Sequence, residues 1–181
     1  MEPWREQLLA DLRAYAATVT DPVEAAMLAE YRPFITAHAD CLWRSCRPGH
    51  LTASAWIVDA ARQRTLLTHH HKLDRWLQLG GHVDGNPDLK SAALREAREE
   101  SGLRRIRTIT EEIFDVDRHR IPARGEEPEH WHYDVRYLLE ADPTELLTVS
   151  SESKELAWVE LARVAILNPS ESLARMVRKT R

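Results

Sequence analysis

The sequence predicts an α+β protein in which a helical N-terminal region is followed by strands and by one strongly capped helix. Apolar residues recur at three- and four-residue steps from residue 3 to about residue 18, a spacing typical of an amphipathic helix. Residues 51–58 have the composition of a strand, and residues 130–141 alternate as a strand does. The run 88–102 begins with a capping residue and ends with glycine, as helices do.

The elements are expected in the following order. A second helix begins at Asp21-Pro22, and Pro33 kinks or interrupts it. Residues 51–58 and 65–68 form a hairpin, and residues 106–116 supply one or two strands. Residues 119–129 are rich in proline, glycine and charge and predict a mobile loop. A last strand within residues 150–161 leads to a short helix at 161–167 and a final helix capped by Asn168-Pro169.

The helix predicted after Asp88 carries the chemistry. Glu96, Glu99 and Glu100 share an arc of roughly 100° on a helical wheel. Clustered like charges cost an exposed helix roughly 0.2–0.5 kcal/mol per pair, and a divalent cation would remove that cost. The alternative is a solvated face that Arg95 and Arg98 neutralise. Gly80-Gly81 favours the first interpretation, because it predicts a turn that brings backbone close to this helix.

Residues 80–103 resemble the signature box of the Nudix hydrolases. That box has fixed glycine, arginine, glutamate and aliphatic positions, and this chain has matching residues in register: Gly81, Arg95, Glu96, Ala97, Glu99, Glu100, Gly102 and Leu103. The resemblance implies the Nudix fold, a mixed β-sheet sandwiched between helices. It also implies two regions, an N-terminal helical extension at 1–49 and a Nudix hydrolase domain at 50–181. The extension would pack on the core or on a partner in a homodimer, or else cover the substrate cleft.

One position departs from the box. Pro87 stands where the family has its first glutamate, which in the family supports the loop and partners the box arginine. Asp84 or Asp88 is a candidate substitute, although Asp88 is also explained as a simple helix cap.

The resemblance implies a metal-dependent hydrolase of a nucleoside diphosphate linked to another moiety, or of a related pyrophosphate. Glu96, Glu99, Glu100 and the Gly81 carbonyl would hold Mg²⁺ or Mn²⁺ ions. A box glutamate or Glu152 would remove the proton from water, and Arg95 would orient the glutamates.

Candidate substrate-binding residues lie outside the box. In similar Nudix proteins the strand before the box leads substrate to the metal, so Lys72 or Arg75 would contact phosphate and Trp76 would stack on a base. A core position for Trp76 is the favoured alternative, because large aromatic residues are usually buried. His132 and Asp134 share the polar face of the 130–141 strand, which is either the cleft floor or an ordinary solvent-facing side.

The composition limits the classes of partner that the protein is expected to bind. With 25 Lys+Arg against 29 Asp+Glu, the chain has a formal net charge of −4 and no broad basic field for a nucleic-acid polymer. No stretch approaches the roughly 20 apolar residues of a membrane span, so a cytoplasmic location is expected. Cys41 and Cys46, with His38 and His50 nearby, fit no standard zinc-finger spacing.

Two other activities remain open at this point. A Nudix-fold module without catalysis could sense a nucleotide, which the missing glutamate at Pro87 favours and the intact helix carboxylates oppose. The isopentenyl diphosphate isomerases share the fold, but they use a cysteine near the metal site, and residues 79–82 contain none.

Overall fold

The first three helices follow the apolar spacing of the sequence. The computed structural model describes residues 2–151 and 153–181, beginning with α1 (Pro3–Ala16), α2 (Pro22–Ala29) and α3 (Tyr31–Ala37). Asp21 caps α2 by accepting from the backbone N–H groups of Val23 and Glu24. The helix breaks at Glu30, three residues before Pro33. Proline has no backbone N–H to donate to the carbonyl of Ala29, four residues earlier, and its ring crowds that carbonyl. The predicted interruption is confirmed.

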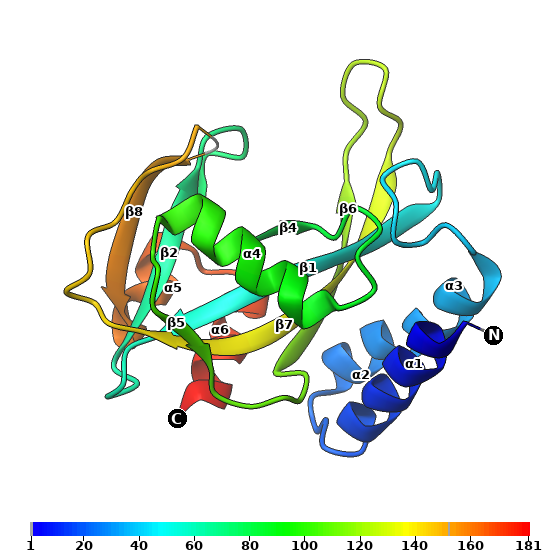
Figure 1. Ribbon diagram of the computed structural model, residues 1–181, viewed down its shortest axis with the longest axis horizontal. Coiled ribbons are helices and arrows are strands. Elements are labelled where there is room, and N and C mark those ends of the chain that lie inside the picture. The colour runs from blue at the N-terminus through cyan, green and yellow to red at the C-terminus, as the bar shows by residue number, and fades with distance from the viewer. Residues whose placement is uncertain (1, 152) are drawn as a thin grey trace.

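A mixed sheet forms the centre of the described part of the molecule (Figure 1). Its strands are β1 (Gly49–Val58), β2 (Arg64–His70), β3 (Arg75–Leu77), β4 (Leu79–His82), β5 (Ile106–Thr108), β6 (Asp115–Ile121), β7 (His130–Ala141) and β8 (Ser153–Glu160). β1 pairs in parallel with β7 and antiparallel with β2 and β4. β7 pairs antiparallel with β5 and β6. β2 pairs antiparallel with β3 and β8.

The predicted hairpin is confirmed, since Val58 lies opposite Thr65 where β1 turns into β2. The expected turn at Gly80-Gly81 is wrong, because both glycines lie within β4, opposite Ser54 and Ala53 of β1. Gly80 has φ 147°, and a Cβ there would lie 2.5 Å from the Ser54 Cα. Glycine is therefore needed here for close strand packing as well as for conformation.

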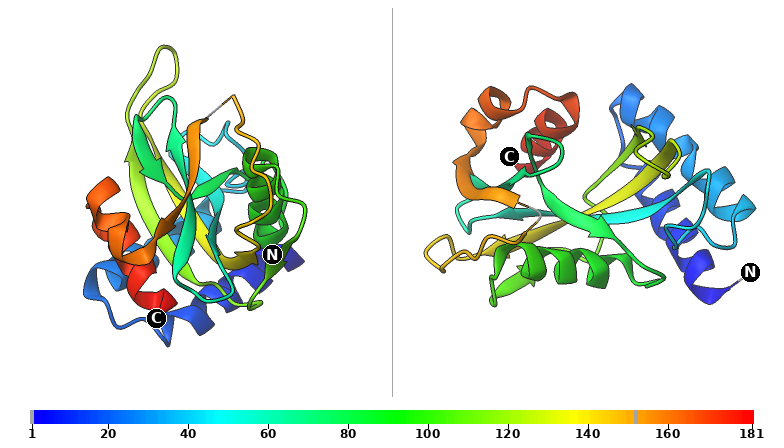
Figure 2. Two further views of the ribbon diagram at one scale, coloured as in Figure 1. Left: turned by 90° about the vertical axis from the view of Figure 1, so that its left-hand side faces the viewer. Right: turned by 90° about the horizontal axis from the view of Figure 1, so that it is seen from above.

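Helices cover both faces of the sheet. On one face, α4 (Leu89–Ser101) packs on β1 and β4, and on the other lies α6 (Glu171–Thr180). The right panel of Figure 2 shows the sheet between these two helices. Two hydrophobic clusters fill the layers, one containing Ala93 and Ala97 of α4, the other Leu173 and Met176 of α6. The mixed sheet sandwiched between helices is thus confirmed.

Two boundaries differ from expectation. The loop expected at 119–129 is shorter, because β6 continues to Ile121, which pairs with His130, and the strand pair projects as a long hairpin in Figure 1. A short 3₁₀ turn (Leu161–Arg163) and α5 (Val164–Leu167) form the expected short helix. The cap of α6 is Ser170, whose hydroxyl accepts from the Leu173 N–H, and Asn168 instead bonds the Trp76 carbonyl.

The N-terminal helices share the hydrophobic core with the sheet. Tyr31 donates to the carbonyl groups of Asp117 (2.8 Å) and Asp134 (2.7 Å), and Phe34 stacks on Tyr133 with the ring centroids 3.9 Å apart. Leu8 and Leu12 of α1 belong to the same buried cluster as the strands. None of the described helices is long and apolar enough to cross a membrane.

Candidate active site

Helix α4 presents its carboxylates beside the sheet, as its local sequence predicts. Asp88 caps the first turn by accepting from the Ser91 N–H at 2.9 Å, and Gly102 ends the helix with φ 73°. Ala97 and Ser101 are fully buried against the core. The adjoining face then carries Glu96, Glu99 and Glu100, which helical periodicity places side by side.

The two glycines of β4 lie directly against these glutamates. A Cβ on Gly81 would stand 2.7 Å from the Glu96 Oε2, so a larger residue here would force that carboxylate to shift. The Gly80 N–H donates to the Glu100 Oε2 at 3.0 Å, and Glu100 is only 6% exposed. Glu99, by contrast, is exposed. Oxygen donors on one helix face, beside backbone that approaches closely, are a donor set suited to Mg²⁺ or Mn²⁺.

Arg95 connects the glutamates to the strand. Its Nη1 lies 2.7 Å from the Glu96 Oε1 and 3.0 Å from the Glu99 Oε2, while its Nη2 donates to the His82 carbonyl at 3.0 Å. A planar guanidinium can meet three such acceptors in fixed directions, which an ammonium group cannot do. These contacts are the ones expected of a residue that orients the glutamates.

The loop with Pro87 is held by residues 42–44. The Gly85 N–H donates to the Leu42 carbonyl at 2.9 Å, and Gly85, with φ 82°, packs against the Trp43 ring. Arg44 forms an ion pair with Asp84 at 3.0 Å, and this interaction lowers the pKa of Asp84 below its usual value. Asp88 is the helix cap. Asp84 thus pairs with Arg44 and also interacts electrostatically with Arg95, and the segment before β1 helps to support the loop.

The arrangement matches a known family. A model of the NUDIX domain matches residues 48–179, which is more than half of the chain. The chain belongs to the NUDIX family. It is a Nudix-type pyrophosphohydrolase acting on phosphorus-containing acid anhydrides, and Nudix hydrolases generally use divalent metal ions.

Solved structures of Nudix proteins share the fold. An Ap4A hydrolase from C. elegans in a binary complex is 21% identical, with a TM-score of 0.57 over 71% of this chain and 93% of that chain. The dihydroneopterin triphosphate pyrophosphohydrolase of E. coli is 15% identical, with a TM-score of 0.55 over 71% and 92%. The NUDIX domain of Shewanella oneidensis NrtR, complexed with ADP ribose, is 18% identical, with a TM-score of 0.52 over 72% and 85%. The comparison with curated proteins gave no match.

The candidate substrate residues before the Nudix box lie on the β2–β3 hairpin. Lys72 is exposed in the turn, and Arg75 is exposed at the start of β3. Trp76 is half-buried, stacks on His69 with the ring centroids 5.1 Å apart, and packs on the cluster beneath α6. The Trp76 ring thus contacts both the hydrophobic core and His69 of the hairpin. Glu152 lies outside the described residues.

Asp134 lies in a buried ionic network, and the expectation of an open cleft floor or solvent face is wrong for it. It is 2% exposed, and its carboxylate accepts from the hydroxyl groups of Thr52 and Ser54 and from Arg136 at 2.8–3.0 Å. Arg136 also donates a hydrogen bond to Asp115. Asp115 accepts another from Arg175 of α6. Around Asp134 and Arg136 the polar face is buried within this network, to which α6 contributes Arg175 and the Ser172 hydroxyl.

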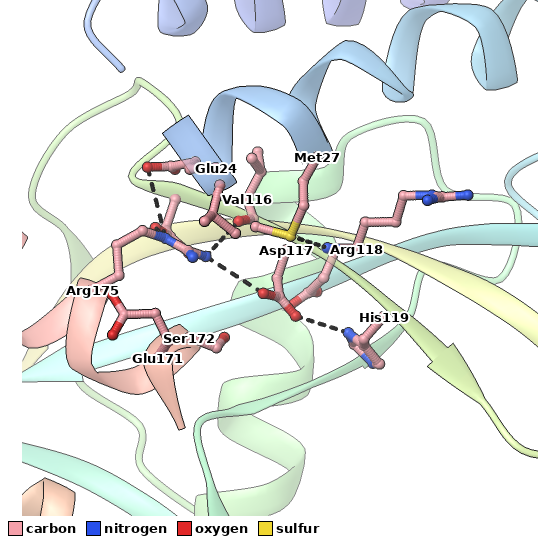
Figure 3. Close-up of polar contacts among 12 residues, drawn as sticks. Glu24, Met27, Val116, Asp117, Arg118, His119, Glu171, Ser172 and Arg175 are labelled. Carbon is pink, nitrogen blue, oxygen red and sulfur yellow. Dashed lines mark hydrogen bonds and ion pairs between the residues drawn. The ribbon is translucent and has the colours of Figure 1, made fainter. Parts of the chain in front are cut away.

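The network continues to α2 and to a histidine (Figure 3). The Arg175 guanidinium lies 3.7 Å from Glu24 of α2 and 3.4 Å from Asp117 of β6. The other Asp117 oxygen contacts the His119 Nδ1 at 3.0 Å. Charged side chains therefore run from the N-terminal helices to the histidines of the sheet.

A cluster of histidines, which sequence reasoning did not identify, lies at that end of the sheet. The His50 ring is 4.7 Å from the His132 ring, 4.9 Å from His82 and 5.0 Å from His130, measured between centroids. Burial, and then the neighbouring His82, lower the pKa of His50 to about 3. Burial and the nearby histidines lower the pKa of His132 to about 2, so both rings are neutral at neutral pH. His132, a candidate substrate residue, is thus half-buried among imidazole rings.

Proposed function

We propose that this Nudix protein hydrolyses a nucleoside diphosphate linked to another moiety, or a related pyrophosphate, with Mg²⁺ or Mn²⁺. The observation that supports this most strongly is the α4 face of three glutamates set against the glycines of β4. Glu96, Glu99, Glu100 and the Gly81 carbonyl are the proposed ligands. When bound, the metal neutralises pyrophosphate charge and makes a bound water more acidic.

The residues of this chain have the following proposed parts in the reaction. Water attacks one phosphorus, the bond to the bridging oxygen breaks, and Glu99 or Glu152 takes the proton from the water. Arg95 holds Glu96 and Glu99 in place for this step.

Substrate contacts are proposed for the β2–β3 hairpin. Lys72 and Arg75 are exposed cations that can pair with phosphate, and Trp76 offers a ring face to a base. Asp134 has its oxygens engaged by Thr52, Ser54 and Arg136, so we assign it the support of β1 beneath the site. The structural neighbours that carry Ap4A and ADP ribose in their names make these two compounds the first substrates to test.

The test is hydrolysis of a panel of nucleoside triphosphates, dinucleoside polyphosphates, ADP ribose and nucleotide sugars, with Mg²⁺ or Mn²⁺. Glu99→Gln is expected to lower kcat by about 10²–10³-fold or more, the loss typical of one removed electrostatic group. Glu112→Gln, an exposed glutamate outside α4, is the matched control and should leave kcat unchanged.

The rival function is a Nudix-fold module that binds a nucleotide without hydrolysing it. Tight, metal-dependent ligand binding with no turnover by the native protein or by either variant would overturn the hydrolase and favour this sensor.

A further inference from the structure

Five histidines from four strands gather on the sheet face opposite α4. His50 lies opposite His132 in the β1–β7 pairing, and His119 lies opposite His132 in the β6–β7 pairing. Residues that pair directly across strands point to the same face, so these rings meet. His82 of β4 and His130 of β7 complete the group, with ring centroids 4.9–5.3 Å from their nearest neighbours.

Three of these rings have donor atoms in coordination range. One ring nitrogen from each of His50, His130 and His132 lies within 4.8 Å of the other two. The Nε2 atoms of His130 and His132 are 3.3 Å apart. Two nitrogens bound to one tetrahedral Zn²⁺ at its usual bond length stand about 3.3–3.4 Å apart, so this pair already has the required spacing.

The outer contact of His130 is one that metal-binding histidines make. The His130 Nδ1 lies 2.9 Å from the Pro128 carbonyl, to which it must donate, and its Nε2 therefore carries the lone pair. The ring nitrogen that is not bound to a metal usually donates to a carbonyl or a carboxylate in this way.

His50 provides an independent observation. Its ring is 1% exposed, and both of its nitrogens are buried without a hydrogen-bond partner among the described residues. A buried polar group in this state is rare and calls for an explanation such as a bound ion. One His50 nitrogen lies within 4.8 Å of donor atoms of His130 and His132, so an ion among the three would give that nitrogen a partner.

We propose that His50, His130 and His132 bind a divalent transition-metal ion, with Zn²⁺ as the ion that fits best. Imidazole nitrogens select Zn²⁺ and its neighbours, whereas the oxygen donors of α4 suit Mg²⁺ or Mn²⁺. The chain therefore has two chemically distinct metal sites. Three histidines leave a fourth tetrahedral position, and the His82 ring lies nearby, with its centroid 4.9 Å from that of His50 and 5.3 Å from that of His132. The ion joins β1 to β7, and the Arg95 contact with the His82 carbonyl connects this region to the Nudix box.

The test uses the full chain without an affinity tag, stripped of metal by a chelator and titrated with Zn²⁺ by calorimetry. We expect one tightly bound Zn²⁺ per chain, and Co²⁺ in its place should give the intense visible absorption of tetrahedral coordination. His132→Gln should weaken Zn²⁺ binding by at least about 10–100-fold, the loss seen even for outer-shell partners.

Two controls separate this site from others. His71→Gln removes an exposed histidine of the 69–71 run and should leave Zn²⁺ affinity unchanged. Glu99→Gln alters the box and should also retain the Zn²⁺. Zn²⁺ binding that is absent in the native protein, that survives His132→Gln, or that disappears in either control would overturn the proposal.

X-ray absorption of the zinc-loaded native protein makes the test independent of folding in the variants. Three imidazole ligands are expected around the ion, and a shell made only of oxygen would overturn the site.

Discussion

At the scale of single residues, the arginine of the Nudix box has a role that its shape allows us to test. Arg95 meets Glu96, Glu99 and the His82 carbonyl at 2.7–3.0 Å. Lysine keeps the charge but lacks the planar fork, so we predict that Arg95→Lys lowers kcat by about 10–100-fold, as loss of outer-shell support does. Steady-state kinetics with Mg²⁺ measures this. A variant with native kcat would show that Arg95 does not position the glutamates.

Helical periodicity made the glutamates of α4 predictable as a group, because spacing along one helix fixes which side chains are neighbours. The burial of Asp134 was not predictable. Alternation along β7 shows that Asp134 and Arg136 share a face, but Arg175, which helps to bury that face, is far away in the sequence. A strand pattern does not identify what packs on it.

At the scale of elements, α4 offers a test of how this chain functions without the first box glutamate. Asp88→Ala should lower the free energy of unfolding by about 1 kcal/mol, because the Ser91 N–H loses its acceptor. Asp88→Asn retains a capping side chain and should be close to native. Urea unfolding measures both, and kcat should change in neither. A loss of kcat in both variants, with little loss of stability, would instead mean that Asp88 replaces the missing glutamate.

Elements with strong local signals were predicted well, whereas β4, which is defined by its pairing with β1, was not. The caps Asp88 and Gly102 lie in one short segment, so sequence placed α4 correctly. Gly80 and Gly81 suggest a turn when read alone, yet β4 exists because β1 pairs with it. The partners of such a strand lie elsewhere in the chain, which local propensity does not reveal.

At the scale of the whole molecule, Asp115 holds distant segments together. It is fully buried and accepts from Arg175 and Arg136 at 2.8–3.0 Å and from Lys179 at 2.7 Å. Asp115→Asn should lower the free energy of unfolding by about 3–5 kcal/mol at pH 7, because it leaves buried cations without their counter-charge. Urea unfolding of the native protein and the variant gives the difference.

The difference in free energy of unfolding between the native protein and Asp115→Asn should decrease as the pH is lowered. Burial opposes the charge of Asp115, but the two arginines and the lysine outweigh it and hold its pKa below the usual 3.8. The stabilisation is therefore complete above pH 3.8 and is lost as the pH falls through the lower folded-state pKa. The gap between native protein and variant should stay constant from pH 7 to about pH 5 and narrow only below about pH 4. A gap that narrows near pH 6 would contradict this assignment.

The histidine cluster shows why sequence alone missed a candidate site. His130 and His132 are close in the chain, but His50 joins them only through the parallel pairing of β1 with β7. Local reading placed His50 near Cys41 and Cys46 instead, and the spacing of that group matched no standard finger. Long-range strand pairing, rather than local spacing, creates the set.

The packing of α2 and α3 on the sheet affects which part of the chain folds as one unit. The family match begins at residue 48, yet Phe34 covers Tyr133 and Glu24 lies beside Arg175. A protease cut between α3 and β1, followed by loss of the helices, would expose an aromatic surface and a half-paired charge. We therefore expect the N-terminal helices and the region that matches the NUDIX domain to unfold together in one cooperative step.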